Sequence, residues 1–447
     1  MSETLINIPG RLHSVATEGV VTGADEVMDD NIGEPQSQIN ANYNKKLDLI
    51  INDIDQSREI ILEKLENAGE LEHFHVTSYI IDQSNPIGLP ATFIRKTTAS
   101  KDAIKTIEID EEEVYIDVIK RIWANTKLCV GLYDSTNRIL KCKEVSREDK
   151  SLYADGTPVV ISESDEYDVF MKLPSFYWRC SELDTDIAHI EFSMSEDYVD
   201  NTWHFWDGST FIGVYKAHLR DTKIYSKPGV SISNGIGGIG LWRQYARNRG
   251  HNNNYSSISY ESHRIMTLLL FGWFNTTKSV DILGTYTSSD FLSGGCDNLG
   301  ITDGVSNQNN YYNLWGLEGW IRGGAEVIDN IKTINTSGVQ ALYERDLTTV
   351  NRNITTHLNH DENGTLNGLV LGSNGDVFPD RQIVGDGSYS RGFATRTNYR
   401  READCNMLRS LDDIAGSYVW RTDTYDYAGI CSRLEYKGDY EFVESFV

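Results

Sequence analysis

The amino-acid sequence predicts a mainly β protein with a short N-terminal coiled coil, on two observations. Between residues 71 and 195, apolar and polar side chains alternate in short segments separated by turns, which is the period of half-buried β-strands. Residues 36–68 instead place apolar side chains mostly three, four or seven positions apart, as in the seam of a coiled coil. All nine tryptophans follow residue 120, so the acidic front and the aromatic rear of the chain are different kinds of structure.

The overall composition excludes several classes of protein. The chain has 447 residues and a net charge of −25, and 39% of it is hydrophobic. Its length predicts two or three domains, and its hydrophobic content excludes an intrinsically disordered chain. The acidic balance argues against nucleic-acid binding, which requires Lys and Arg to neutralise phosphates. No apolar run reaches the roughly 18 residues of a membrane span, and the first ten residues lack the features of a secretion signal. We therefore expect no membrane insertion.

The front of the chain divides into a leader, residues 1–35, and a coiled coil, residues 36–69. Residues 1–70 hold five basic and fourteen acidic side chains, which predicts a solvated stalk rather than a core. A helix that packs on its own domain is the alternative, but the flanking sequence offers few apolar partners. Isoleucine at both Ile50 and Ile54 is compatible with a trimer. The expected oligomerisation residues are Ile39, Tyr43, Leu47, Ile50, Ile54, Ile61 and Leu65.

Residues 70–160 predict a β-rich spacer domain, and strand-like alternation continues beyond it. The expected strands lie within residues 72–82, 105–123, 127–134, 138–145, 157–162, 167–173, 175–180 and 189–195, with a turn at 154–158. One helix is predicted over residues 259–274, with Ser259 as its N-cap and Glu261 in its first turn. Apolar residues wrap most of this helix, so we expect it to be buried. Beyond residue 280, segments rich in Gly, Asn and Ser predict a domain dominated by loops.

Several motifs that could carry chemistry are better explained as structure. We interpret His357, His360, Asp361 and Glu362 as part of a polar turn, so we expect no metal and no cofactor. The glycine-rich segment 234–242 lacks the context of a dinucleotide loop and predicts a flexible turn that includes Gly235, Gly237, Gly238 and Gly240. Six cysteines without metal-site spacing predict buried free thiols. No pair of carboxylates is marked as catalytic, so we expect that the protein is not an enzyme.

Three stretches together resemble virion proteins of phages. Residues 19–30 and 36–40 are similar to the leader that precedes a short coiled coil in virion proteins of phages infecting gut bacteria, including the crAss-like group. Residues 167–178 resemble a strand of phage fibre proteins. The helix at 259–274, its Gly- and Asn-rich continuation and residues 431–438 follow the order of the C-type-lectin-like fold of phage tropism determinants and formylglycine-generating enzymes. The closing segment departs from that family in reading Ser432-Arg433-Leu434, and no cysteine pair matches the copper-binding pair of the enzymes, so oxidase activity is not implied.

The resemblance implies a C-terminal C-type-lectin-like α+β domain over residues 161–447 and a phage fibre subunit that mediates attachment to the host cell surface. The implied partners are the other copies of a homotrimer, other virion proteins at the leader, and a host glycan or surface protein. The implied location is the virion, after synthesis in the host cytoplasm, and a tail fibre and a head fibre are both compatible with it. Two alternatives stay open: a capsid or head-fibre decoration protein that makes only protein contacts, and a polysaccharide depolymerase spike.

Aromatic loops are the candidate binding residues, because Tyr, Trp, Asn, Ser and Gly are enriched in binding loops. Four clusters lie at residues 203–206, 311–320, 398–401 and 420–427. The two C-terminal clusters are preferred, since the resembling tropism determinants bind toward their C-termini. Arginines there could pair with carboxylates of acidic glycans, and internal ion pairs with core packing are the alternative. The expected ligand-binding residues are Asn398, Tyr399, Arg400, Arg401, Trp420, Arg421, Tyr425 and Tyr427.

Overall fold

The computed structural model describes residues 76–82, 92–95, 106–109, 112–115, 117–184, 187–233, 239–275, 293–295, 299–301, 305–308, 311–320, 325–334, 339–343, 350–355, 365–370, 378–383, 405–409, 419–420 and 430–446. The chain divides into two units, Met1–Leu71 and Glu72–Val447, and all described residues belong to the second. The expected leader, the coiled coil and its seam residues therefore lie outside them. No helix in the described ranges is long and apolar enough to cross a membrane.

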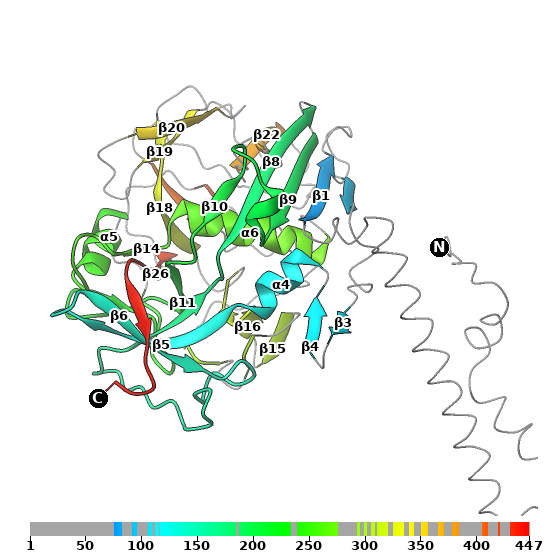
Figure 1. Cartoon of the computed structure of the whole chain (residues 1–447). Coiled ribbons are helices and arrows are strands. Elements are labelled where there is room, and N and C mark those ends of the chain that lie inside the picture. The colour runs from blue at the N-terminus through cyan, green and yellow to red at the C-terminus, as the bar shows by residue number, and fades with distance from the viewer. Residues whose placement is uncertain are drawn as a thin grey trace, which may run out of the picture. The chain divides into compact units, whose positions relative to one another are not determined.

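The described part of the chain is mainly β-sheet, as the alternation predicted (Figure 1). An antiparallel five-stranded sheet runs in the order β10 (His204–Trp206), β8 (Phe176–Asp184), β9 (Ile187–Ser193), β1 (Val76–Asp82) and β2 (Thr92–Arg95). A seven-stranded sheet runs in the order β14 (Tyr255–Ser257), β26 (Arg433–Lys437), β11 (Thr210–Lys216), β7 (Asp168–Lys172), β5 (Lys127–Asp134), β6 (Ile139–Val145) and β27 (Tyr440–Phe442). In this second sheet only β6 and β27 pair in parallel.

The remaining described strands form further sheets. A six-stranded sheet consists of β20 (Val350–Thr355), β19 (Val339–Tyr343), β18 (Ala325–Ile334), β23 (Cys405–Arg409) and β24 (Val419–Trp420), with β25 (Ile430–Cys431) paired to β18. A three-stranded sheet holds β15 (Val305–Gln308), β16 (Tyr311–Leu314) and β17 (Leu317–Glu318). Three hairpins pair β3 (Thr106–Ile109) with β4 (Glu112–Tyr115), β12 (His218–Arg220) with β13 (Lys223–Tyr225), and β21 (Thr365–Val370) with β22 (Phe378–Ile383).

The described ranges contain three α-helices, α4 (Val118–Ala124), α5 (Ile239–Arg247) and α6 (Tyr260–Phe274), and the short 3-10 helix η2 (Glu196–Tyr198). Helix α6 confirms the helix predicted over residues 259–274. At its start the Ser259 side chain accepts a hydrogen bond from the Ser262 N–H, and at its end Asn275 adopts the left-handed conformation. Most of its side chains are buried, as its apolar circumference predicted.

The seven-stranded sheet contributes side chains to two hydrophobic cores. Leu128 and Val130 of β5 belong to a core that also takes in side chains of α4, α6 and the five-stranded sheet. Cys129, between them in the sequence, belongs to a second core with Trp242 of α5. Both faces of β5 are therefore covered, and its sequence reads as a nearly continuous apolar run. Cys129 and Cys142 are buried free thiols, as predicted, and Cys180 and Cys431 are buried as well.

The structure does not divide at residue 160, where the sequence predicted the end of a spacer domain. Strands β5 and β6 precede that position, yet β5 pairs with β7 and shares a sheet with β11 and β26. Strand β1 likewise pairs with β9, with Tyr79 opposite Ile190. Strands from 70–160 and 161–447 thus form common sheets, because local alternation says nothing about which distant strands pair.

Three short segments also differ from their predicted structures. Residues 118–124 form α4 rather than a strand, because the Asp117 side chain accepts a hydrogen bond from the Lys120 N–H and caps a helix. Residues 157–162 contain no named strand. The glycine-rich segment predicted as a flexible turn includes the start of α5, so that Gly240 lies in its first turn.

Candidate functional site

The ligand-binding residues predicted from the sequence fall almost entirely outside the described residues. This is the case for Asn398, Tyr399, Arg400, Arg401, Arg421, Tyr425 and Tyr427. Trp420 ends β24, where it lies opposite Met407 of β23, and its side chain is outside the described part. The polar segment 357–362 is outside as well. Within the described ranges no three His, Cys, Asp or Glu side chains are grouped as metal ligands.

The aromatic cluster at residues 311–320 belongs to the hydrophobic core. The side chains of Trp315 and Trp320 are 0% and 2% exposed. The Trp320 ring stacks on the ring of His263 in α6, with 5.8 Å between the ring centroids. For these two tryptophans the alternative of core packing is correct, and they are not available to a ligand.

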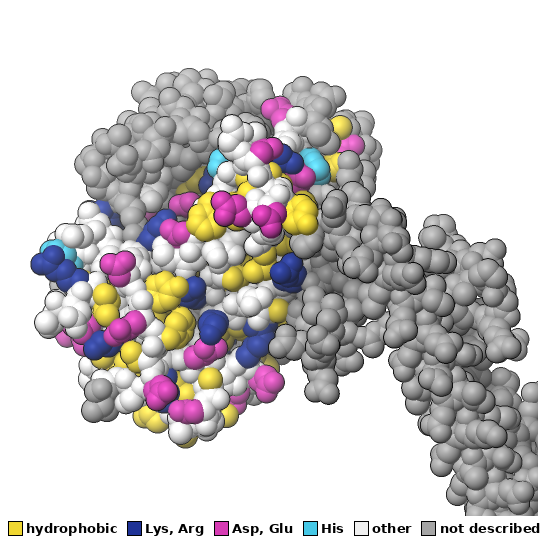
Figure 2. Space-filling view, in the orientation of Figure 1, with side chains coloured by type: hydrophobic (Ala, Val, Ile, Leu, Met, Phe, Trp, Pro, Cys, Tyr) yellow, Lys and Arg dark blue, Asp and Glu magenta, His cyan; other side chains and the backbone are white. Residues whose placement is uncertain are grey.

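The aromatic cluster at residues 203–206 divides between the core and the surface. Trp206 is buried, whereas the neighbouring Phe205 is 54% exposed. Phe205 lies opposite Tyr177 in the pairing of β10 with β8, and the two ring centroids are 4.8 Å apart at an interplanar angle of 35°. Tyr177 is half-buried. Together the two rings form an aromatic platform on the outer side of the five-stranded sheet, and Figure 2 shows hydrophobic and acidic side chains interspersed around β10.

An ion pair continues this platform along β8. Arg179 is two residues beyond Tyr177 and faces the same side of the sheet. Its Nε and Nη2 atoms lie 2.7 and 2.6 Å from Oε2 of Glu191, the residue opposite it on β9. The guanidinium also covers the half-buried Trp203 ring, 4.7 Å from its centroid. We name this surface, made of Tyr177, Arg179, Glu191, Trp203 and Phe205, the Phe205 face.

The Phe205 face combines the two kinds of group that recognise sugars. Exposed aromatic rings offer flat apolar area on which the C–H face of a pyranose can lie. Fixed carboxylate and guanidinium groups offer charge-assisted hydrogen bonds to hydroxyl groups. Arg179 is held in place by Glu191, by Thr202 Oγ1 at 3.2 Å and by the Trp203 ring, so the polar part of the face is ordered before a ligand arrives. No group on it is arranged as a nucleophile with a base.

Sequence reasoning found part of this face and missed the rest. The cluster at 203–206 was recognised from its aromatic content, and alternation in β8 places Tyr177 and Arg179 opposite the buried Trp178. Glu191 could not be assigned, because its position beside Arg179 depends on the register between β8 and β9. Strand register is set by long-range pairing, which no local signal in this sequence specifies.

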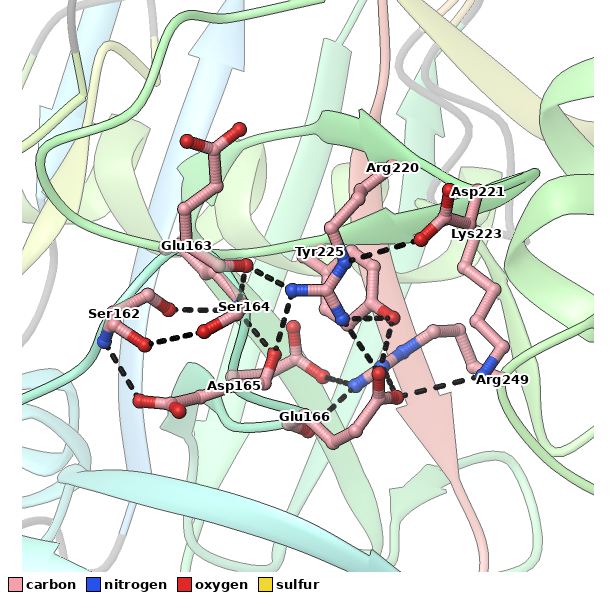
Figure 3. Close-up of polar contacts among 12 residues, drawn as sticks. Ser162, Glu163, Ser164, Asp165, Glu166, Arg220, Asp221, Lys223, Tyr225 and Arg249 are labelled. Atoms are coloured by element: carbon pink, nitrogen blue, oxygen red, sulfur yellow. Dashed lines mark hydrogen bonds and ion pairs between the residues drawn. The ribbon is translucent and has the colours of Figure 1, made fainter.

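A second cluster of charged groups lies where the segment 162–166 meets the β12–β13 hairpin and the end of α5. Figure 3 shows its contacts, which link carboxylates and carbonyl groups of that segment to cations of the other two elements. Arg249 bridges Glu166 and the buried Asp168, and its guanidinium carbon lies 3.8 Å from the centroid of the Tyr225 ring. Arg220 donates to Glu166 and to the Tyr225 hydroxyl. Each of these cations has protein partners, so we interpret the cluster as a structural clamp.

Lys227 completes the clamp from the interior. Its side chain is fully buried, and its Nζ donates to the backbone carbonyls of Ser162, Glu163 and Asp165. Burial lowers the pKa of Lys227 to about 8. Partial burial raises the pKa of Glu166, but the Tyr225 hydroxyl and the charges of Arg249, Lys223 and Arg220 outweigh it and lower that pKa overall. These groups therefore stabilise one another.

Neither a scan against protein-family models nor a search of curated proteins finds a match to this chain. The chemistry of the Phe205 face therefore carries the functional proposal.

Proposed function

We propose that this chain is a phage virion fibre subunit that attaches the particle to its host, and that the Phe205 face contacts a sugar of the host surface. The observation that carries the proposal is the exposure of Phe205, 54%, beside Tyr177 and an ordered Arg179–Glu191 pair. An exposed aromatic ring beside fixed polar groups offers apolar area for stacking together with oriented hydrogen-bonding groups.

The resemblance to phage fibres supports the same proposal. Residues 167–178, which resemble a fibre strand, form β7 and the start of β8, and β8 carries Tyr177. In this proposal the rear of the chain has the C-type-lectin-like arrangement, residues 1–35 anchor it to the virion, and residues 36–69 form a trimeric coiled coil. Three faces on one trimer would bind several sugars at once, so that weak single contacts add up to firm attachment.

A glycan array and a host adsorption assay test the proposal with Phe205→Ala. Truncating a central aromatic anchor typically costs about 2 kcal/mol of binding free energy, or roughly 30-fold in Kd. We expect the affinity for the bound glycan to fall by about this factor and adsorption to the host to fail. The melting temperature should not change, because Phe205 is mostly exposed. Full adsorption by Phe205→Ala would exclude this face as the attachment site.

A second candidate function, a decoration protein that contacts other virion proteins, has an observation of its own. Strand β27 ends the seven-stranded sheet, and its Tyr440 and Phe442 side chains are 38% and 40% exposed. Phe442→Ala is therefore both a matched control and a discriminating variant. Attachment through the Phe205 face predicts normal adsorption by Phe442→Ala, whereas a decoration protein held through β27 would assemble poorly onto particles in that variant.

A further inference from the structure

We propose that the Phe205 face selects neutral sugars over acidic ones such as uronates, an inference that rests on the attachment function proposed above. The sequence suggested the opposite preference, because arginines near the C-terminus could pair with acidic glycans. On the described surface the positive group is already bonded to the protein, and an exposed carboxylate lies beside it.

The guanidinium of Arg179 is already engaged by the protein. Its Nε and Nη2 atoms contact Oε2 of Glu191, and its Nη1 donates to Thr202 Oγ1 at 3.2 Å and lies 3.6 Å from Oδ2 of Asp200. Each of its three nitrogens thus has a protein partner. A ligand carboxylate needs the paired N–H groups of a guanidinium for strong binding, and here that edge faces Glu191.

The acceptors on this face outnumber its cations. Both contacts from Arg179 to Glu191 fall on Oε2, and the Glu191 side chain is 11% exposed. Asp200 is a second carboxylate beside Arg179, and its side chain is 60% exposed. Hydrogen bonds from the Thr202 side chain and backbone lower the pKa of Asp200, so it is ionised at neutral pH. Two carboxylates therefore flank one guanidinium.

The exposed carboxylate of Asp200 favours ligands that bring O–H donors. A sugar hydroxyl can donate to Asp200 while its ring lies on Phe205 and Tyr177. A uronate would place a like charge within a few ångström of these carboxylates, which is unfavourable in a partly desolvated site. His189, whose Nδ1 is 3.7 Å from Oε2 of Glu191, would add a positive charge if protonated, so the comparison belongs at about pH 8.

Matched pairs of neutral and acidic oligosaccharides test the preference on the full-length protein. Suitable pairs have the same glycosidic linkage and differ only at C6: galacto- and galacturono-oligosaccharides, manno- and mannurono-oligosaccharides, and gluco- and glucurono-oligosaccharides. Titration calorimetry at about pH 8 should give at least one neutral member a Kd roughly tenfold or more below that of its acidic counterpart. Asp200→Asn and Glu191→Gln each remove one negative charge. Both should lower the ratio of the acidic member's Kd to the neutral member's Kd. Glu144→Gln, on an exposed carboxylate paired with Lys127 in the other sheet, should leave it unchanged.

The outcomes separate this inference from the proposed function. Equal or tighter binding of the acidic members, still lost in Phe205→Ala, would overturn the neutral preference and leave the attachment function standing. Phe205-dependent host adsorption without binding of any neutral member would overturn it as well. Adsorption that does not depend on Phe205 would instead refute the attachment function itself. If Glu191→Gln does not fold, Asp200→Asn still tests the preference. Asp200 is exposed, so its substitution should not disturb the fold.

Discussion

We expect Arg433→Met to be among the most destabilising single substitutions in the described part of the chain. Arg433 lies in β26, and its side chain is completely buried. It donates two hydrogen bonds to Oε1 of Glu326, at 3.1 and 2.8 Å. Three more reach the backbone carbonyls of Gly213, Val214 and Glu318, at 2.7–2.8 Å. One guanidinium thus joins β26 to β11, β17 and β18.

The magnitude follows from what the substitution leaves behind. Methionine fills similar volume, so the loss is electrostatic rather than a cavity. Glu326 stays buried, with Lys216 Nζ at 3.5 Å from its Oε1 as partial compensation, and three carbonyl groups lose a donor. Removing one member of a buried ion pair costs about 3–5 kcal/mol. We expect a loss of about 4 kcal/mol in the free energy of unfolding.

Urea unfolding followed by tryptophan fluorescence measures this loss. Arg433→Lys should cost about half as much, because it keeps the charge but one ammonium cannot reach all the acceptors. The double variant Arg433→Met with Glu326→Gln should lose less than the two single variants together, by roughly 1–3 kcal/mol. Lys127→Met is the matched control at an exposed ion pair, with Nζ 2.7 Å from Glu144 and an expected change within about 1 kcal/mol. A loss below about 1 kcal/mol for Arg433→Met, or strict additivity in the cycle, would refute the reasoning.

Two further predictions concern the clamp and helix α6. Because burial lowers the pKa of Lys227 to about 8, the unfolded chain binds more protons than the folded chain above that pH, so stability should rise from about pH 8 to 10. Urea midpoints across this range should lose that rise in Lys227→Met, and an equal slope in both proteins would contradict the assignment. Gly272→Ala, which on an exposed helix would stabilise by roughly 1 kcal/mol, should instead lower the melting temperature by several degrees. A Cβ there would lie 2.4 Å from Ile119 and 2.7 Å from Tyr79, so an unchanged or higher melting temperature would show that these side chains can move aside.

Local sequence signals predicted the elements whose pattern is strong over their whole length. β5 coincides with its expected segment, and α6 has both an N-cap at Ser259 and an uninterrupted apolar run. The short α4 follows β3 and β4 in one alternating stretch, and only the capping bond from Lys120 to Asp117 distinguishes it. Helix α5 begins beside glycines, which favour turns, and is fixed by the burial of Trp242 in a core assembled from distant strands. Tertiary packing overrode local preference in α5, whereas in α4 a local cap overrode the strand-like alternation.

The candidate site shows the same limit more sharply. Composition located Phe205, and alternation placed Tyr177 and Arg179 on one face. What the sequence could not supply is the partner of Arg179, and the partner decides the chemistry. A free arginine beside two rings would favour acidic ligands, whereas an arginine held by Glu191 directs its paired N–H groups to the protein. Ligand class therefore depends on strand register as much as on residue type.

The overall charge of the chain offers a second reason for a neutral preference, and the two reasons can be separated. Arg249, Arg243 and Arg433 are buried against Asp168, Asp329 and Glu326. These pairs cancel, so the excess of acidic residues behind the net charge of −25 lies outside them. The negative electrostatic field of these acidic residues repels any polyanion, wherever it binds on the chain. This field is screened within about 10 Å at 0.1 M salt. The ion-pair contacts of Arg179 with Glu191 and Asp200 lie within 4 Å, and charge interactions at this range in a partly buried site are screened much less. Raising the salt should therefore leave most of the neutral preference in place if the face itself selects the sugar. A preference that disappears with salt, and is insensitive to Asp200→Asn, would belong to the whole chain.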